Sequence, residues 1–342
     1  MTLFDEILAQ DGPLSTLKRA LQSRRVAQAY LFEGPGGVGK KKTALALAST
    51  MLCIENQTGC GRCNNCRRIA NRTHPDVRVF EPRSEGNRNI QVDFVRDEIL
   101  PFARFAPFEG ACAFVIFPQA DVSFPAQHAE AANALLKTLE EPRANLHFLL
   151  LAERPDRLLA TIRSRCQRVR FGRLPAKVID AILAREAATD SARQAAKALA
   201  CGRADRALEL SQGEKAEKLL EHSLRIDATV DAAKPGELID RAEELARSDD
   251  LVLVLETLAL FYRDVAAAAL GLSIKEISFG HLYDLAKKRA QQLGASSAAR
   301  RVDLIYRTCE NIERNANKEL CLDALLFDLG SASSLGRVSE SL

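Results

Sequence analysis

The sequence lacks three features that would each assign a protein to a class. No long apolar segment stands at its N-terminus, where Asp5 and Glu6 come early, so a secretory signal is not expected. Its most apolar later run, residues 251–262, is too short to span a bilayer and contains Glu256. Neither charge is in excess, since 48 basic and 45 acidic residues give a net charge of +3, and this excludes a global polycation that binds nucleic acid in bulk. A cytoplasmic protein is therefore expected.

The sequence also lacks an internal repeat, and nine cysteines are an awkward number for a disulfide framework. Its composition, 47% hydrophobic and 27% charged, is that of an ordinary globular protein. At 342 residues the chain is long enough for two or three domains, each with a core of its own.

The first informative segment is a glycine-rich loop at residues 34–43, GPGGVGKKKT, between the apolar run 29–32 and a helix start. It fits the pattern G-x-x-x-x-G-K-[ST] at every fixed position but the last. In such loops backbone N–H groups and the lysine bind phosphates, and the hydroxyl holds Mg²⁺. Lys41 replaces that hydroxyl, and Thr43 lies about 200° further round the helix, so it cannot substitute. The remaining phosphate-binding candidates are Gly34, Gly36, Gly37, Gly39 and Lys40.

A second segment carries four bunched cysteines: Cys53, Cys60, Cys63 and Cys66. Four thiolates satisfy tetrahedral Zn²⁺, and overlapping C-x-x-C steps bring neighbouring sulfurs onto one ion. The pattern predicts a closed, structural zinc site, with unligated cysteines or a redox C-x-x-C as alternatives. His74, which precedes a proline, is interpreted as a turn residue rather than a ligand.

A third segment, residues 111–117, is a continuous apolar run of the kind that forms a central strand covered on both faces. In a nucleotide hydrolase the end of this strand presents one acid to Mg²⁺ and a second that polarises the attacking water. Pro118 and Gln119 follow it here, and Asp121 comes too late to replace the pair. The sequence therefore predicts a phosphate loop whose own hydrolytic groups are missing.

The alternation of strands and helices up to residue 174 predicts an α/β domain with a parallel sheet covered on both faces. Alanine-rich helices follow, which predict a small helical domain at 175–211, a larger one at 212–330 and a polar tail at 331–342 that frays. Two leucine stripes, at 251–260 and 320–329, are interpreted as core rather than as partner surface.

Several segments together resemble the bacterial replicative clamp loader of DNA polymerase III, and most closely subunits of its delta-prime type. They are the run 29–32, the four-cysteine insertion, His74-Pro75-Asp76, AANALLKTLEEP at 131–142, Ser164-Arg165-Cys166, residues 205–208 and residues 315–317. The resemblance covers nearly the whole chain. It implies an AAA+ module with a zinc insertion at about 53–66, a helical lid and a C-terminal collar that joins a pentameric ring.

The resemblance also implies roles for two arginines. In such rings ATP lies between subunits, and Arg165 matches the arginine that reaches the γ-phosphate in the neighbour's site, with Ser164 and Cys166 completing its motif. Such a residue, an arginine finger, is worth roughly 10³–10⁵ in rate. Arg206 matches a lid arginine that senses nucleotide in the subunit's own site.

Delta-prime subunits act as stationary partners, which agrees with Lys41, Pro118 and Gln119 at the lost catalytic positions. The resemblance thus implies a non-hydrolysing scaffold with structural Zn²⁺ and weak or absent ATP or ADP binding. It would act in a complex with gamma/tau-type ATPases, a delta subunit, the sliding clamp and primer–template DNA.

Three alternatives stay open. The chain would be an active AAA+ motor if Gln119 and Asp121 took over metal ligation. It would be a zinc-dependent nucleic-acid binder if Arg67, Arg68 and Arg72 met phosphates rather than solvent. Arg165 would be an ordinary salt-bridge residue if its motif served only the fold.

Overall fold

The computed structural model describes residues 2–82, 89–184, 190–212, 214–230, 235–314 and 316–335. The chain divides into two units, one of Met1–Ile179 with Gly202–Asp205 and the other of Asp180–Cys201 with Arg206–Leu342. Whether residues 175–211 act as a separate lid stays a prediction. Two expected features fall partly on residues outside the described ones: the segment 315–317 and the tail beyond Leu335.

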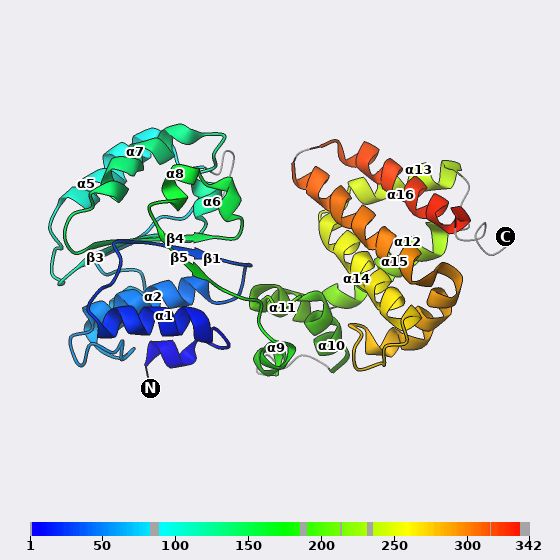
Figure 1. The fold of residues 1–342 in the computed structure, drawn as a ribbon, viewed down its shortest axis with the longest axis horizontal. Coiled ribbons are helices and arrows are strands. Elements are labelled where there is room, and N and C mark those ends of the chain that lie inside the picture. The colour runs from blue at the N-terminus through cyan, green and yellow to red at the C-terminus, as the bar shows by residue number, and fades with distance from the viewer. Residues whose placement is uncertain are drawn as a thin grey trace. The chain divides into compact units, whose positions relative to one another are not determined.

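The first unit is built on a five-stranded sheet with the strand order β2-β3-β4-β1-β5. Its strands are β1 (Ala29–Glu33), β2 (Val77–Val79), β3 (Ala113–Phe117), β4 (Leu146–Ala152) and β5 (Gln167–Arg170). Every pairing is parallel. All residues of β1, β3 and β4 are buried, because helices lie on both sides of the sheet (Figure 1). The predicted α/β architecture is confirmed.

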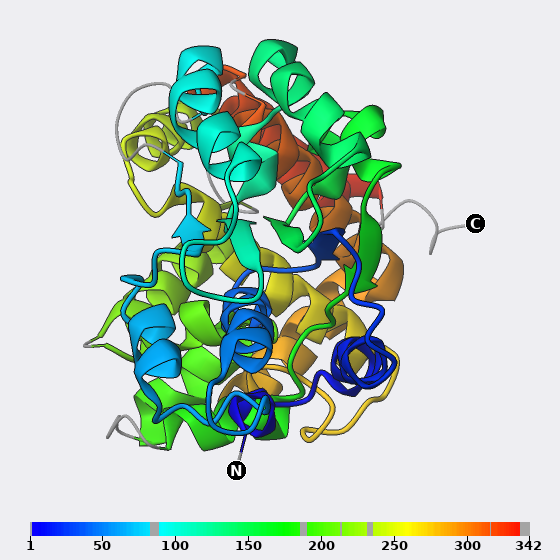
Figure 2. The ribbon, with the colours of Figure 1, turned by 90° about the vertical axis from the view of Figure 1, so that its left-hand side faces the viewer.

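The helices of this unit alternate with the strands, as the sequence predicted. They are η1 (Leu3–Glu6), α1 (Asp11–Gln22), α2 (Lys40–Leu52), α3 (Asn64–Ala70), α4 (Val92–Phe94), the π-helix η2 (Val95–Ile99), α5 (Leu100–Arg104), α6 (Ala120–Ser123), α7 (Ala129–Glu140), η3 (Pro155–Arg157), α8 (Ala160–Arg163) and the first half of α9 (Ala176–Leu183), whose second half belongs to the other unit. In Figure 2 the blue helices α1 and α2 lie on one side of the strands, and the cyan to blue-green helices α5 and α7 lie on the other. The described residues 90–96 form no strand, because the chain turns into α4 at Val92.

The core of this unit places the chemistry at one edge of the sheet. Val115, Phe117 and Phe148 from β3 and β4 are fully buried together with Val95 and Leu135 from the covering helices. Because the strands are parallel, their carboxyl ends share one edge. The glycine loop after β1 and the residues after β3 and β4 therefore lie close together.

The second unit is helical in its described residues. It contains α10 (Asp190–Leu199), most of α11 (Ala204–Ser211), α12 (Lys215–Val230), α13 (Pro235–Ala246), α14 (Leu251–Ala269), η4 (Gly280–Leu282), α15 (Tyr283–Glu313) and α16 (Lys318–Leu335). The leucine stripes are core, as interpreted, with Leu255 and Leu322 fully buried, whereas Leu320 is 68% exposed. Since α16 runs to Leu335, the first part of the expected tail is helical, and residues 336–342 lie outside the described ones.

A buried arginine ties the helices of the second unit together. Arg301 on α15 donates to Tyr262 Oη on α14 at 2.8 Å and to the carbonyl oxygen of Leu329 on α16 at 2.8 Å. Tyr262 in turn donates to Asp227 Oδ1 on α12 at 2.8 Å. Buried polar groups that are bonded in this way fix how helices are aligned. Of the helices described, none has the length and apolar content needed to cross a membrane.

Candidate functional site

The lysine of the glycine loop is turned onto the loop itself. Lys40 begins α2, and its Nζ donates to the carbonyl oxygens of Gly34 at 2.6 Å and Pro35 at 2.5 Å. Burial lowers the pKa of Lys40, against the opposing effect of Glu153 and Asp121. The ammonium group therefore already has oxygen partners where a phosphate would have to replace them.

A pocket of about 390 Å³ joins the loop to the positions at which hydrolytic groups were predicted to be missing. It is lined by Gly36, Gly37, Gly39, Lys40, Lys41, Lys42, Glu81, Pro118, Gln119, Leu151, Glu153 and Asp205. Lys41 Nζ pairs with Glu81 at 2.6 Å. The three substituted positions thus meet in one pocket, and the residue at the hydroxyl position is a cation in an ion pair.

Charged side chains crowd the glycines of this loop. Arg203 Nη1 lies 3.6 Å from Glu153 Oε2, and Arg203 Nη2 lies 3.1 Å from Asp205 Oδ2. A methyl group on Gly37, whose φ is +63°, would lie 2.0 Å from Asp205 Oδ1, and one on Gly36 would lie 2.5 Å from Arg203 Nη2. The backbone N–H of Ala204 also donates to the Gly37 carbonyl oxygen at 3.1 Å. The side chains of Arg203, Glu153 and Asp205 thus occupy space beside the loop that a bound phosphate would need.

An active motor would require Asp121 to bind the metal ion, but here its carboxylate binds backbone N–H groups. It is 6% exposed, and its Oδ2 accepts backbone hydrogen bonds from Glu153 at 3.2 Å and Arg154 at 2.8 Å. The carboxylate therefore holds the loop that follows β4. This arrangement weighs against Asp121 as a replacement metal ligand.

The Ser-Arg-Cys element forms the end of the short helix α8. Ser164 Oγ donates to the Thr161 carbonyl oxygen at 3.1 Å, which satisfies a group at the helix end. Cys166 is 8% exposed and belongs to the core between sheet and helices, and burial raises the pKa of its thiol to about 12. A neutral thiol anchors the segment on one side, and the serine terminates the helix on the other.

Arg165 lies between these two anchors and pairs within its own chain. Its Nη1 donates to the Thr161 carbonyl oxygen at 2.8 Å, and its Nη2 forms a hydrogen-bonded ion pair with Glu140, the last residue of α7. The side chains are 31% and 45% exposed. The salt bridge considered as an alternative for Arg165 is therefore present, at a site open to solvent.

The four cysteines of the predicted metal site come together between α2 and α3. Their Sγ atoms all lie within 4.8 Å of one another, and Cys60 and Cys66 are 4.0 Å apart. Zinc–sulfur bonds of about 2.3 Å in a tetrahedron require sulfurs about 3.8 Å apart, so this donor set fits zinc. Burial raises the pKa of Cys53, but backbone N–H groups of Asn56, Cys60 and Glu55 bring it down to about 5. That cluster does not include His74, whose Nδ1 accepts from the Asp76 N–H at 3.2 Å.

Comparison with known proteins shows that the chain is similar to subunits of DNA polymerase III. The model of the family described as "DNA polymerase III, delta subunit" matches residues 9–175. The DNA polymerase III subunit delta' of Bacillus subtilis is 28% identical over 94% of this chain and 96% of that protein. The corresponding Pseudomonas aeruginosa subunit is 41% identical over 41% of this chain and 42% of that protein. The chain is thus similar to DNA polymerase III delta' subunits, to one of them along nearly its whole length.

The chain is also similar to proteins that are named gamma/tau subunits of DNA polymerase III. The DNA polymerase III subunit gamma/tau of Mycobacterium bovis is 34% identical over 53% of this chain and 31% of that protein. The chain thus spans nearly all of the Bacillus relative but less than half of the other two. The similarity to gamma/tau is that of one part of each chain.

The predicted nucleotide-sensing role of Arg206 stays a prediction, and the structure shows a partner for this arginine in its own unit. Arg206 pairs with Glu256 on α14, within the second unit. From this segment it is Arg203 and Asp205 that lie against the glycine loop. Sequence reasoning missed these two residues, although their position beside the matched arginine was a usable signal.

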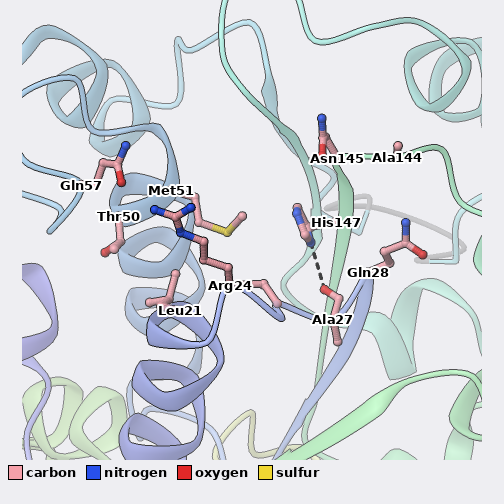
Figure 3. A pocket seen from close by; sticks show the side chains of 11 residues that line it. Leu21, Arg24, Ala27, Gln28, Thr50, Met51, Gln57, Ala144, Asn145 and His147 are labelled. Carbon is pink, nitrogen blue, oxygen red and sulfur yellow. Dashed lines mark hydrogen bonds between the residues drawn. The ribbon is translucent and has the colours of Figure 1, made fainter.

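A larger cavity lies elsewhere on the first unit. It measures about 910 Å³ and is formed where β1 and β4 begin, with His147, Asn145, Arg24 and Gln28 among its lining residues (Figure 3). The glycine loop follows the opposite, carboxyl end of β1. The predicted phosphate, finger and metal residues are not among those that line it. A search by cavity volume alone would therefore have selected the edge of the sheet opposite the glycine loop.

Proposed function

We propose that the chain is a non-hydrolysing subunit of the replicative clamp loader, which serves as scaffold and supplies Arg165 in trans to a neighbouring ATPase subunit. In this way it would help to load the sliding clamp on primed DNA. The observation that carries the proposal is the pocket in which Lys41, Pro118 and Gln119 meet the glycine loop. Among the described residues that line it, none supplies the metal-binding hydroxyl after Lys40 or the pair of acids after β3 that hydrolysis requires.

Two further features of the pocket support weak or absent binding of ATP and ADP. The Lys40 ammonium group donates hydrogen bonds to carbonyl oxygens of the loop. The Asp205 carboxylate lies so close to Gly37 that it would collide with a methyl group there. The acids that do line the pocket have basic partners: Glu81 pairs with Lys41, and Glu153 and Asp205 pair with Arg203. An active motor would have to break these pairs to hold Mg²⁺.

The proposed contribution to chemistry is the guanidinium group of Arg165. Its planar fork can bond two oxygens of a γ-phosphate and stabilise the charge that develops during transfer. The short helix α8 and the buried Cys166 hold its backbone, while its side chain stays partly exposed. A neighbouring subunit would therefore meet an arginine on a rigid support.

Zinc would be held by Cys53, Cys60, Cys63 and Cys66 as a structural ion that fixes the turn between α2 and α3. All four positions are filled by protein, so no coordination position is left for a substrate. The nucleic-acid alternative loses support in this region. Arg68 pairs with Glu109 at 2.5 Å and Arg72 with Glu81 at 3.2 Å, so two of the three arginines are engaged with carboxylates, although Arg67 and Arg72 are both exposed.

The test is ATP hydrolysis by the complex reconstituted with gamma/tau-type and delta subunits. We expect Arg165→Ala to assemble normally and to slow hydrolysis at the neighbouring site by roughly 10³–10⁵, the range for arginine fingers. Arg163→Ala, which removes the same charge at the same helix end, is the matched control. An unchanged rate with Arg165→Ala, or ATP turnover by the isolated wild-type chain with DNA, would contradict the proposal.

A further inference from the structure

We infer that Glu140 is a positioning residue for Arg165, which holds the guanidinium group on its own subunit until a phosphate displaces the carboxylate. This inference rests on the proposed function of Arg165 in trans. Glu140 ends α7, and Arg165 follows α8, so two separate elements bring the pair together. The distance between them in sequence is 25 residues.

The geometry leaves the guanidinium group with both terminal nitrogens engaged. Nη1 donates to the Thr161 carbonyl oxygen at 2.8 Å, and Nη2 donates to Glu140. A bidentate grip on a phosphate needs two N–H groups on one edge of the fork. A γ-phosphate that approaches the edge of the fork next to Glu140 therefore competes with this carboxylate for Nη2.

The position of Glu140 is hard to explain by the stability of α7 alone. The C-terminus of a helix carries partial negative charge, which disfavours a carboxylate in the last turn. Glu140 is the last residue of α7 and Glu141 is its C-cap. It is Glu140 that forms the ion pair with Arg165. The carboxylate is thus compensated by the one residue that the proposed function assigns to the neighbour's site.

The ion pair between Arg165 and Glu140 is weak enough to break when a phosphate binds Arg165. Both side chains are partly exposed, and ion pairs of this kind change an equilibrium by up to about fivefold. Such a contact keeps the guanidinium group near its working position, and a doubly or triply charged phosphate can still displace it. Removing the carboxylate charge should shift the population of Arg165 towards the released form.

The test compares Glu140→Gln with wild type in the reconstituted complex. We expect the KM for ATP to fall by about two- to fivefold while kcat changes little, because release of Arg165 precedes the chemical step. Glu141→Gln, with the same change one residue further, should leave KM unaltered. In the double variant Glu140→Gln/Arg165→Ala the gain should disappear, because the carboxylate acts through Arg165.

The outcomes separate this inference from the proposed function. If Arg165→Ala slows hydrolysis but Glu140→Gln leaves KM unchanged, raises it or lowers kcat, Glu140 is not a displaceable partner and the inference fails alone. If Arg165→Ala has no effect, the proposed function itself fails. A melting temperature of Glu140→Gln equal to that of wild type checks that the fold is intact.

Discussion

Two buried histidines make single residues of the sheet unit sensitive to pH. His147 stacks on Phe114 with ring centroids 5.1 Å apart, and its Nδ1 lies 2.9 Å from the Ala27 carbonyl oxygen. Burial lowers the pKa of His147, although the bond to Ala27 opposes this. Burial also lowers the pKa of His74, against the nearby carboxylates of Glu109 and Asp76. Both rings are therefore held neutral in the folded chain.

From these shifts we expect the free energy of unfolding to fall as the pH drops below about 6.5, the ordinary pKa of histidine. Below that pH the unfolded chain binds protons that the folded chain excludes, which costs about 1.4 kcal/mol per pH unit for each histidine. Above it the stability is fully present. Urea unfolding between pH 7.5 and 5.5 measures the slope.

A variant isolates the contribution of one ring. His147→Gln should reduce the slope by about one proton, whereas His128→Gln, at an exposed position before α7, should leave it unaltered. Carboxylates titrate in the same way in all three proteins, so the comparison removes their effect. A slope that His147→Gln does not change would show that this ring is not held neutral.

Single residues also show where sequence reasoning stopped. The changes at Lys41, Pro118 and Gln119 could be recognised because a motif fixes what each position should hold. The partners of Asp121 and Arg165 could not, since they lie 32 and 25 residues away and depend on how the loops pack. Local patterns report on spacing along one element and not on contacts between elements.

At the scale of elements, the cysteine segment stands out because its regular secondary structure is limited to the short helix α3. Its first cysteine caps α2, and Cys63 caps the short α3, whose Cys66 N–H donates to Cys63 Sγ at 3.4 Å. A helix of this length is marginal by itself. A metal ion that joins the four sulfurs would supply the energy that keeps this turn folded.

We expect about one equivalent of zinc per chain purified without chelator, and loss of that zinc with Cys63→Ser. The variant should melt at a lower temperature, because structural zinc contributes folding energy directly. Cys321→Ser, a half-exposed cysteine outside the cluster, should keep both zinc and melting temperature. Metal analysis that finds less than about half an equivalent in wild type would count against the site.

The elements of the sheet were the most predictable part of the fold. β3 and β4 are continuous apolar runs, which is the pattern of parallel strands buried on both faces. The π-helix η2 had no signal, because one extra residue in a turn does not alter composition. The stripe on α16 was recognised as core, but periodicity did not show that Leu320 leaves it.

At the scale of the whole molecule, the second unit offers exposed apolar side chains that its own core does not use. Leu320 is 68% exposed and Phe327 is 40% exposed. They are seven residues apart on α16, so they lie on one side of the helix, two turns apart. If this unit forms the proposed collar, it would need exposed anchors, because a few well-packed side chains supply most of the binding energy at protein interfaces.

We therefore expect Leu320→Glu and Phe327→Glu to weaken assembly with gamma/tau-type subunits by roughly tenfold or more, the effect of losing one well-packed anchor. The isolated chain should keep its stability, because substitutions at exposed positions change it by about 0.5 kcal/mol or less. Leu270→Glu is the matched control, since Leu270 is 71% exposed at the end of α14. Dissociation constants from titration of labelled chain measure the effect. Wild-type affinity in both α16 variants would move the interface to another surface of this unit.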